Sequence, residues 1–208
     1  MIAPHSTILD TVAGIVTRST PLTNTKVKAM GVFGRVALLF QYPFVDREAK
    51  DKRALFETLS LRCRDHGSNG WRQLLFFAEG TTTNGRALIS FKHGAFAEGY
   101  PVQPVVLRLS TTPDTLTWTW KQRHTAWRCL LLTLSQCYVS AEMEFLPVYS
   151  PSAAEKADSE LYARSVRRLM AEALGLPTVD LNYDDAKEAK KELGDEAPMD
   201  VMEMLRLP

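Results

Sequence analysis

The sequence has little net charge, few cysteines and no long apolar run. Its 25 Lys and Arg residues nearly balance 24 Asp and Glu residues, and a net charge of +1 gives no case for nucleic-acid binding. The three cysteines, Cys63, Cys129 and Cys137, lack metal or redox spacing, so we expect reduced thiols in the core. The best apolar run, residues 130–139, is too short to cross a membrane, and no signal peptide is evident.

The chain has the composition of one globular domain with a sizeable core, at 208 residues and 45% hydrophobic content. Short apolar or alternating segments predict strands at residues 36–42, 74–77, 102–109, 115–120 and 141–145. Helical spacing predicts a helix at 49–66 and another that follows a capping box at Ser152 and Glu155 and stops at Gly175. Residues 12–17 continue a first helix or turn, and 86–94 form a short helix or a loop. This alternation predicts the α/β class, with a central mixed sheet flanked by helices.

The N-terminal segment His5-Ser6-Thr7-Ile8-Leu9-Asp10 pairs a histidine with an aspartate five positions on. A neutral imidazole can take a proton near pH 7, and a carboxylate can fix its tautomer and stabilise the imidazolium that forms. A helix with Ser6 as N-cap would turn both side chains towards one face. The spacing alone is weak, because a chain with four histidines can contain it by chance.

A second polar segment follows the predicted strand at 74–77 and reads Ala78-Glu79-Gly80-Thr81-Thr82-Thr83-Asn84-Gly85. Gly80 would let the backbone approach a ligand closely, and Asn84-Gly85 is a turn signal. Glu79 is either a charge at a helix N-terminus or a ligand contact. The two glycines half-match a phosphate-binding P-loop but lack its Lys and Ser/Thr, which argues against that site.

Two further blocks complete a pattern. An apolar run at 36–40 leads to Asp46 and Arg47, a residue suited to bidentate phosphate binding, and residues 100–106 form an apolar run broken by two prolines. In this order, the four blocks resemble those of the glycerolipid acyltransferase superfamily. Flanking segments at 91–96, 114–120 and 169–177 resemble the lysophosphatidylcholine and lysophosphatidylethanolamine acyltransferases. The resemblance runs from Pro4 to about Asp185.

The resemblance implies an acyl-CoA-dependent O-acyltransferase. In that family's terms, His5 deprotonates the free hydroxyl of a lysophospholipid, Asp10 orients His5, and the alkoxide attacks the acyl-CoA thioester in one step. It implies a site for the phosphate and glycerol part that consists of Arg47, Glu79, Gly80, Thr81, Thr82, Asn84 and Gly85. It also implies acyl-CoA or acyl-chain contact by Pro101, Val102 and Pro104. We expect no metal and no cofactor, since acyl-CoA is a co-substrate. The sequence departs from the family at Ala78, where many members carry Pro, and at Thr82, where the superfamily often carries Arg or Ser.

The resemblance further implies a membrane surface as partner, no nucleic acid, and a place on the endoplasmic reticulum with the site facing the cytosol. Because family members carry a membrane helix and a strand before the histidine, both are expected to be missing here, with residues 1–180 as the acyltransferase domain and 181–208 as a charged tail. Trp118 and Trp120 are expected in the core, and Trp127 with Arg123 and Arg128 at the membrane interface. The alternatives are a non-catalytic lipid-binding fragment, an acyltransferase for lysophosphatidic acid, or a thioester hydrolase, which would need no Arg47.

Overall fold

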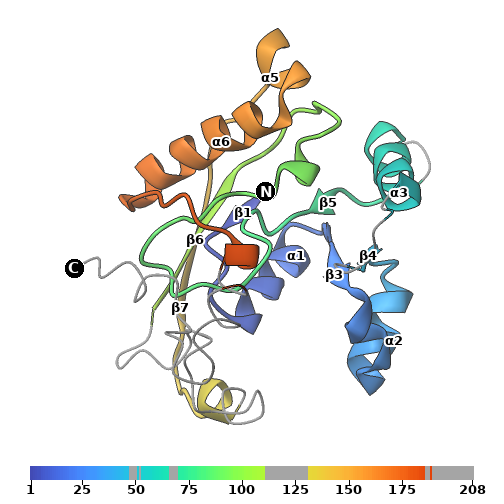
Figure 1. Cartoon of the computed structure of the whole chain (residues 1–208). Helices are drawn as coiled ribbons and strands as arrows, with labels where there is room; N and C mark the ends of the chain where they lie inside the picture. Colours follow the sequence, from blue (N-terminus) through green and yellow to red (C-terminus); the bar gives the residue numbers. More distant parts are fainter. Residues whose placement is uncertain (47–50, 52, 66–69, 111–130, 186–187, 189–208) are drawn as a thin grey trace. The chain divides into compact units, whose positions relative to one another are not determined.

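The computed structural model describes residues 1–46, 51, 53–65, 70–110, 131–185 and 188 (Figure 1). The chain divides into two compact units. The first unit consists of Met1–Asp10 and Phe77–Pro208, and the second consists of Thr11–Phe76. Helices and strands occur in both, which confirms the α/β class, whereas the boundary at residue 180 stays a prediction.

The first unit is built on a mixed sheet of three strands in the order β1 (Ile2–Ala3), β6 (Val105–Ser110) and β7 (Ser140–Phe145). Strand β1 runs parallel to β6, and β7 runs antiparallel to β6. On the other side of β1, Ile2 forms a parallel bridge with Phe77. Both residues of β1 are buried, as are the first three of β6, so β1 and the start of β6 belong to the core of this unit.

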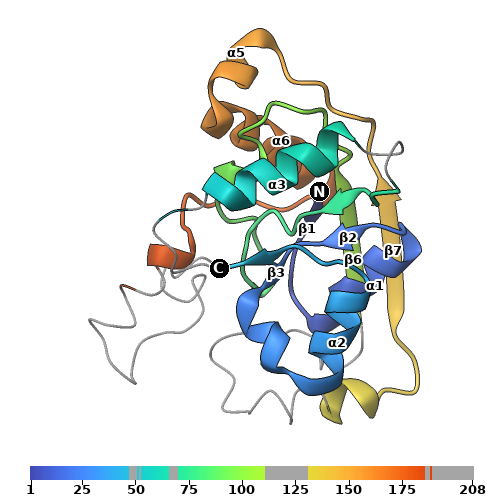
Figure 2. The same ribbon diagram turned by 90° about the vertical axis from the view of Figure 1, so that its right-hand side faces the viewer.

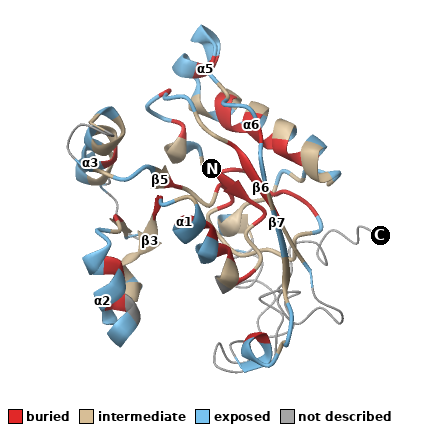
Figure 3. Cartoon of the chain, turned by 180° about the vertical axis from the view of Figure 1, so that it is seen from behind, coloured by how far each residue is buried: buried red, intermediate tan, exposed pale blue. Residues whose placement is uncertain are grey.

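Helix α6 (Ser159–Leu174) packs against β6 and against the short helix η3 (His93–Ala95). It buries one apolar stripe that includes Tyr162, Val166 and Met170. Figure 3 shows buried positions in red along α6. Helix α5 (Ala153–Ala157) begins with the predicted capping box at Ser152 and Glu155. Gly175 ends α6 at a φ of 68°, as predicted, but the single predicted helix is two, because Asp158 leaves the helical conformation and caps α6.

The second unit contains two parallel strand pairs, β2 (Thr20–Pro21) with β5 (Leu74–Leu75) and β3 (Thr23–Asn24) with β4 (Phe44–Val45). The helices in and leading into this unit are η1 (Ile8–Thr11), α1 (Val12–Val16), η2 (Thr25–Ala29), α2 (Gly31–Leu39) and α3 (Arg53–Arg64). Among its described residues, the buried apolar side chains include Ala13, Ala37, Leu59 and Leu75. Among the described residues, no helix of either unit is long and apolar enough to cross a bilayer.

The predicted strand at 36–42 is wrong, because helix α2 occupies most of that range. Ala37, Leu38 and Leu39 favour helix, and a short apolar run has no period that separates strand from helix. The helix ends where Gln41 takes a φ of 56°, just before Tyr42-Pro43. The predicted strands at 74–77, 102–109 and 141–145 and the helices at 12–17 and 49–66 are confirmed with shifted ends.

The other sequence predictions have mixed outcomes. Of residues 86–94, 86–92 form a loop and the last two begin η3. Cys137 is exposed and Cys63 half-buried, so the predicted core position of these two thiols is wrong. The residues next to Cys137 include the polar Ser135 and Gln136, which keep this segment at the surface. Cys129, the strand predicted at 115–120 and the tryptophans Trp118, Trp120 and Trp127 lie outside the described residues.

Candidate active site

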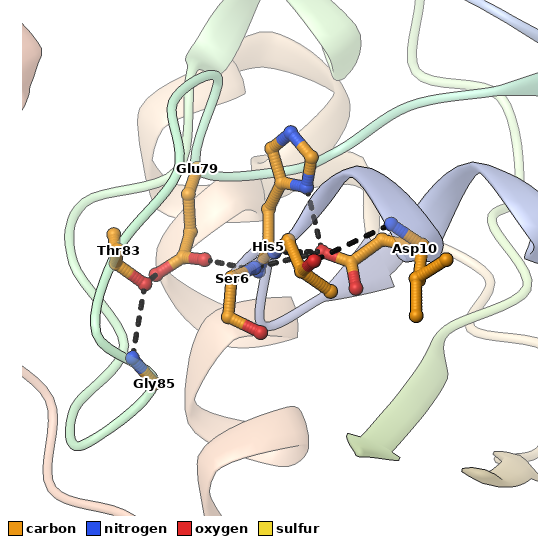
Figure 4. Close-up of polar contacts among 8 residues, drawn as sticks. His5, Ser6, Asp10, Glu79, Thr83 and Gly85 are labelled. Carbon is orange, nitrogen blue, oxygen red and sulfur yellow. Dashed lines mark hydrogen bonds and ion pairs between the residues drawn. The ribbon is translucent and has the colours of Figure 1, made fainter. Parts of the chain in front are cut away.

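His5 and Asp10 form a close pair directly after strand β1. The Asp10 side chain is wholly buried, and its Oδ2 atom accepts a hydrogen bond from His5 Nδ1 at 2.8 Å (Figure 4). The same oxygen accepts the backbone N–H groups of Ser6 at 2.7 Å and Thr7 at 3.1 Å. Asp10 Oδ1 is buried and has no hydrogen-bond partner among the described residues. The carboxylate therefore acts on the imidazole through one oxygen that the local backbone holds in place.

This contact sets the chemistry of the imidazole. With Nδ1 donating to Asp10, the neutral ring carries its proton on Nδ1 and leaves Nε2 as an acceptor. Within the described part of the chain, Nε2 has no hydrogen-bond partner, and the His5 side chain is 18% exposed. The ring stacks on Phe77 with centroids 4.1 Å apart and an interplanar angle of 17°. Nε2 is thus free to take a proton from a bound hydroxyl, in the geometry of a general base.

The turn that brings Asp10 back to His5 differs from the predicted one. Helix η1 begins at Ile8, so the capping position falls on Thr7 rather than on Ser6. Thr7 Oγ1 accepts the N–H of Leu9 at 3.5 Å. The Asp10 carboxylate accepts the N–H groups of Ser6 and Thr7, just before the helix. The predicted pairing is present, and the predicted cap is wrong by one residue.

Glu79 ties the same segment to the turn after Phe77. Its side chain is wholly buried, and Oε2 accepts the backbone N–H of His5 at 2.8 Å. Oε1 accepts the N–H of Ile89 at 3.3 Å and the Thr83 hydroxyl at 3.5 Å. Burial raises the pKa of the Glu79 carboxyl to about 7, against the hydrogen bonds that lower the pKa, and the nearby Asp10 raises the pKa slightly further. Glu79 thus holds the backbone of His5. The sequence had suggested either a charge at a helix N-terminus or a ligand contact, and neither includes this role.

The turn at 80–85 closes around the N-terminal segment. Thr83 donates its backbone N–H to the carbonyl of His5 at 2.7 Å, and the Gly85 N–H reaches Thr83 Oγ1 at 3.4 Å. Gly80 and Gly85 have φ values of 68° and 71°, which glycine tolerates best. Asn84 Oδ1 accepts the N–H of Arg86 at 3.0 Å, and Thr81 and Thr82 are half-buried. This geometry places the predicted turn beside His5, and its role in substrate binding stays a prediction.

Other predicted site residues lie elsewhere or cannot be placed. Arg47 lies outside the described residues. Pro101 is exposed and Pro104 buried, and the contacts that place this block join Val102 to Tyr149 and Pro104 to Leu146. Its contact with an acyl chain stays a prediction. Two contributors were missed: Phe77, which the apolar strand before Glu79 could have suggested, and Ile89, whose backbone contact has no sequence signal.

Comparison with known proteins gives consistent relatives. The chain is 42% identical to lysophosphatidylcholine acyltransferase 1 of Homo sapiens over 192 residues, which is 92% of this chain and 35% of that protein. It is 42% identical to lysophosphatidylcholine acyltransferase 2 of Homo sapiens over 187 residues (89% and 34%). It is 40% identical to lysophosphatidylcholine acyltransferase of Drosophila melanogaster over 187 residues (89% and 34%). The chain spans about a third of the length of these relatives, and no solved structure matches it significantly.

The family model for acyltransferases matches residues 1–108. This range contains the His5–Asp10 pair, Glu79 and the whole turn at 80–85, so the match covers the assembled site and not only the fold around it. The resemblance found in the sequence is confirmed: the chain is similar to lysophosphatidylcholine acyltransferases over most of its length and belongs to the acyltransferase family.

Proposed function

We propose that this chain transfers an acyl group from acyl-CoA to the free hydroxyl of a lysophospholipid, lysophosphatidylcholine or lysophosphatidylethanolamine. His5 Nε2 takes the hydroxyl proton, Asp10 stabilises the imidazolium, and the alkoxide oxygen attacks the thioester carbonyl. The carbon–sulfur bond then breaks and the CoA thiolate leaves, to be protonated by the imidazolium. The relatives named above support the acceptor class, because their names state lysophosphatidylcholine.

One observation carries the proposal. Asp10 Oδ2 holds His5 Nδ1 at 2.8 Å, and Nε2 is unengaged among the described residues. A histidine that is only structural would use both nitrogens within the fold or be solvated without a buried partner. Here a buried carboxylate, itself fixed by backbone N–H groups, orients the ring, which is the arrangement that general-base catalysis requires.

The proposal extends to the surroundings of the site. Arg47 and the turn at 80–85 would hold the phosphate and glycerol of the acceptor, and residues 101–104 would contact the acyl donor. The protein would work at a membrane surface, on the endoplasmic reticulum with the site facing the cytosol, because its proposed acceptor is a lipid. The acyltransferase domain would span residues 1–180, and no metal or further cofactor enters the reaction.

The test is CoA release and product analysis with a long-chain acyl-CoA and a panel of lysophosphatidylcholine, lysophosphatidylethanolamine and lysophosphatidic acid. We expect CoA release that depends on acceptor, with formation of the diacyl product, and its loss in His5→Ala. His93→Ala is the matched control, since His93 is exposed on η3. CoA release without acceptor would favour a thioester hydrolase, and lipid binding by a folded chain without turnover would favour a non-catalytic fragment. Either result would overturn the proposal.

A further inference from the structure

Helix α2 exposes apolar side chains where a surface helix normally carries polar ones. Gly34 and Ala37 are buried and mark the inner face of the helix. Val32, Val36 and Leu39, which we call the α2 stripe, follow the spacing i, i+4, i+7 and lie on the opposite face. They are 73%, 41% and 80% exposed. Figure 3 shows most of α2 in the colour of exposed residues.

The inner face of α2 is occupied by its own neighbour. A Cβ atom on Gly34 would collide with the backbone carbonyls of Val27 and Lys28, so α2 lies directly on η2 at this point. Figure 2 shows η2, between β3 and α2, beside the helix. Where α2 lies on η2, the residue in contact is therefore the small Gly34, whereas Val32, Val36 and Leu39 face outwards. Leu38 and Phe40, at the end of α2, are exposed as well.

The segment that carries the stripe has charges of one sign, and the first carboxylate after it is Asp46. Residues 11–45 contain Arg18, Lys26, Lys28 and Arg35 but no Asp or Glu, in a chain that is otherwise nearly balanced. All four of these basic residues are exposed. Arg35 lies on α2 next to the stripe, and Lys28 Nζ lies 4.6 Å from the centre of the Phe44 ring. Exposed aliphatic residues bordered by cations are typical of a surface that lies in the interface of an anionic membrane.

We propose that the α2 stripe and the basic residues of 11–45 form a docking surface for an anionic lipid bilayer. The aliphatic side chains enter the boundary of headgroups and acyl chains, and the cations contact lipid phosphates. The occupant is lipid rather than a second copy of this chain, because residues 11–46 offer a partner copy four cations and a single carboxylate, Asp46, to pair with them. This proposal rests on the membrane association proposed above and names the surface that carries it. It is tested by vesicle binding, which does not require the chain to be catalytically active.

The experiment is vesicle flotation of the full chain with phosphatidylcholine vesicles and with phosphatidylcholine vesicles that contain phosphatidylglycerol. We expect tighter binding to the anionic vesicles, and a loss of ~10-fold or more in the double variant Val32→Glu, Leu39→Glu. Lys28→Glu should reduce binding to anionic vesicles only. Val148→Glu is the matched control, because Val148 is 59% exposed, follows β7 and should bind as the parent does. A milder pair, Val32→Thr with Leu39→Gln, removes the apolar stripe without new charge, and circular dichroism confirms that each variant is folded.

Three results would overturn the docking surface. These are unchanged vesicle binding in both double variants, equal loss in Val148→Glu, or equal binding to neutral and anionic vesicles. Self-association in sedimentation velocity that the double variants abolish, with vesicle binding unchanged, would assign the stripe to a second copy of the chain. An inactive chain that still binds vesicles through the stripe would contradict only the proposed function.

Discussion

Helices α6 and α2 differ in where their large apolar side chains lie. Helix α6 buries Tyr162, Val166 and Met170 against its unit, whereas α2 exposes Val32 and Leu39. Helix α6 begins at a side-chain cap, Asp158, while no side chain caps α2 at Met30. Helix α6 is stabilised by the apolar side chains that it buries, whereas α2 carries apolar side chains that are not packed within its own unit. The comparison separates the part of the chain that builds the site from the part that offers a surface.

The largest expected effect separates the site from the surface. His5→Ala should lower turnover by ~10²–10⁴, as loss of a positioned base does, because Nε2 is the proton acceptor. Vesicle binding should stay unchanged, since His5 lies far in the sequence from the α2 stripe and outside its unit. Acyl transfer and flotation measured on the same sample give both readouts. Near-parental turnover in a folded His5→Ala protein would remove the histidine from the mechanism.

The two helices can be compared directly by truncation. Met170→Ala should lower the free energy of unfolding by ~2–5 kcal/mol, because Met170 is wholly buried and its loss leaves a cavity. Leu39→Ala should change it by less than ~0.5 kcal/mol, because Leu39 is mostly exposed. Urea denaturation followed by circular dichroism measures both. Similar losses in the two variants would mean that α2 is packed in solution and that its stripe is not a free surface.

Within the site unit, Glu79 should make stability depend on pH. Its pKa lies near 7 in the folded protein and near 4.5 when unfolded, so the folded state holds the proton between these values. The contribution of the Glu79 carboxyl to the free energy of unfolding is therefore fully present below pH 4.5 and is lost as the pH rises through about 7. The Glu79→Gln side chain cannot ionise. The free energy of unfolding of this variant, relative to that of the parent, should therefore rise by roughly 2–4 kcal/mol between pH 5 and pH 8. Urea denaturation of both proteins at the two pH values tests this, and a constant difference would contradict it.

The smallest effect concerns the starts of the two helices. Asp158 accepts the N–H groups of Glu160 and Leu161, so Asp158→Ala should cost ~1 kcal/mol of stability. Met30→Ala is the matched change at α2 and should stay within ~0.5 kcal/mol, because Met30 makes no side-chain cap. Thermal unfolding of both variants measures the difference. Equal losses would show that Met30 supports α2 through contacts other than capping.

The sequence predicted what local chemistry determines. The His5–Asp10 pair, the capping box at Ser152 and the stop at Gly175 all depend on residues a few positions apart. It could not predict α2 as a helix, because Val36 to Phe40 are apolar in either conformation and the fold around them decides. It also could not predict that Glu79 binds the backbone of His5, since 74 positions separate the two residues. Contacts of that length depend on the arrangement of strands.

The hydrogen bonds around Asp10 span at most five positions along the chain, whereas the bond from His5 to Glu79 spans 74. Closing a short loop costs little chain entropy, and closing a long one costs more. His5 and Asp10 can therefore form their hydrogen bond in a largely unfolded chain. The hydrogen bond to Glu79 forms only when strand β1 pairs with Phe77 and with β6. Local unfolding that detaches β1 would leave the pair intact and the site gone, so a folded sheet, more than an intact pair, is the condition for a working base.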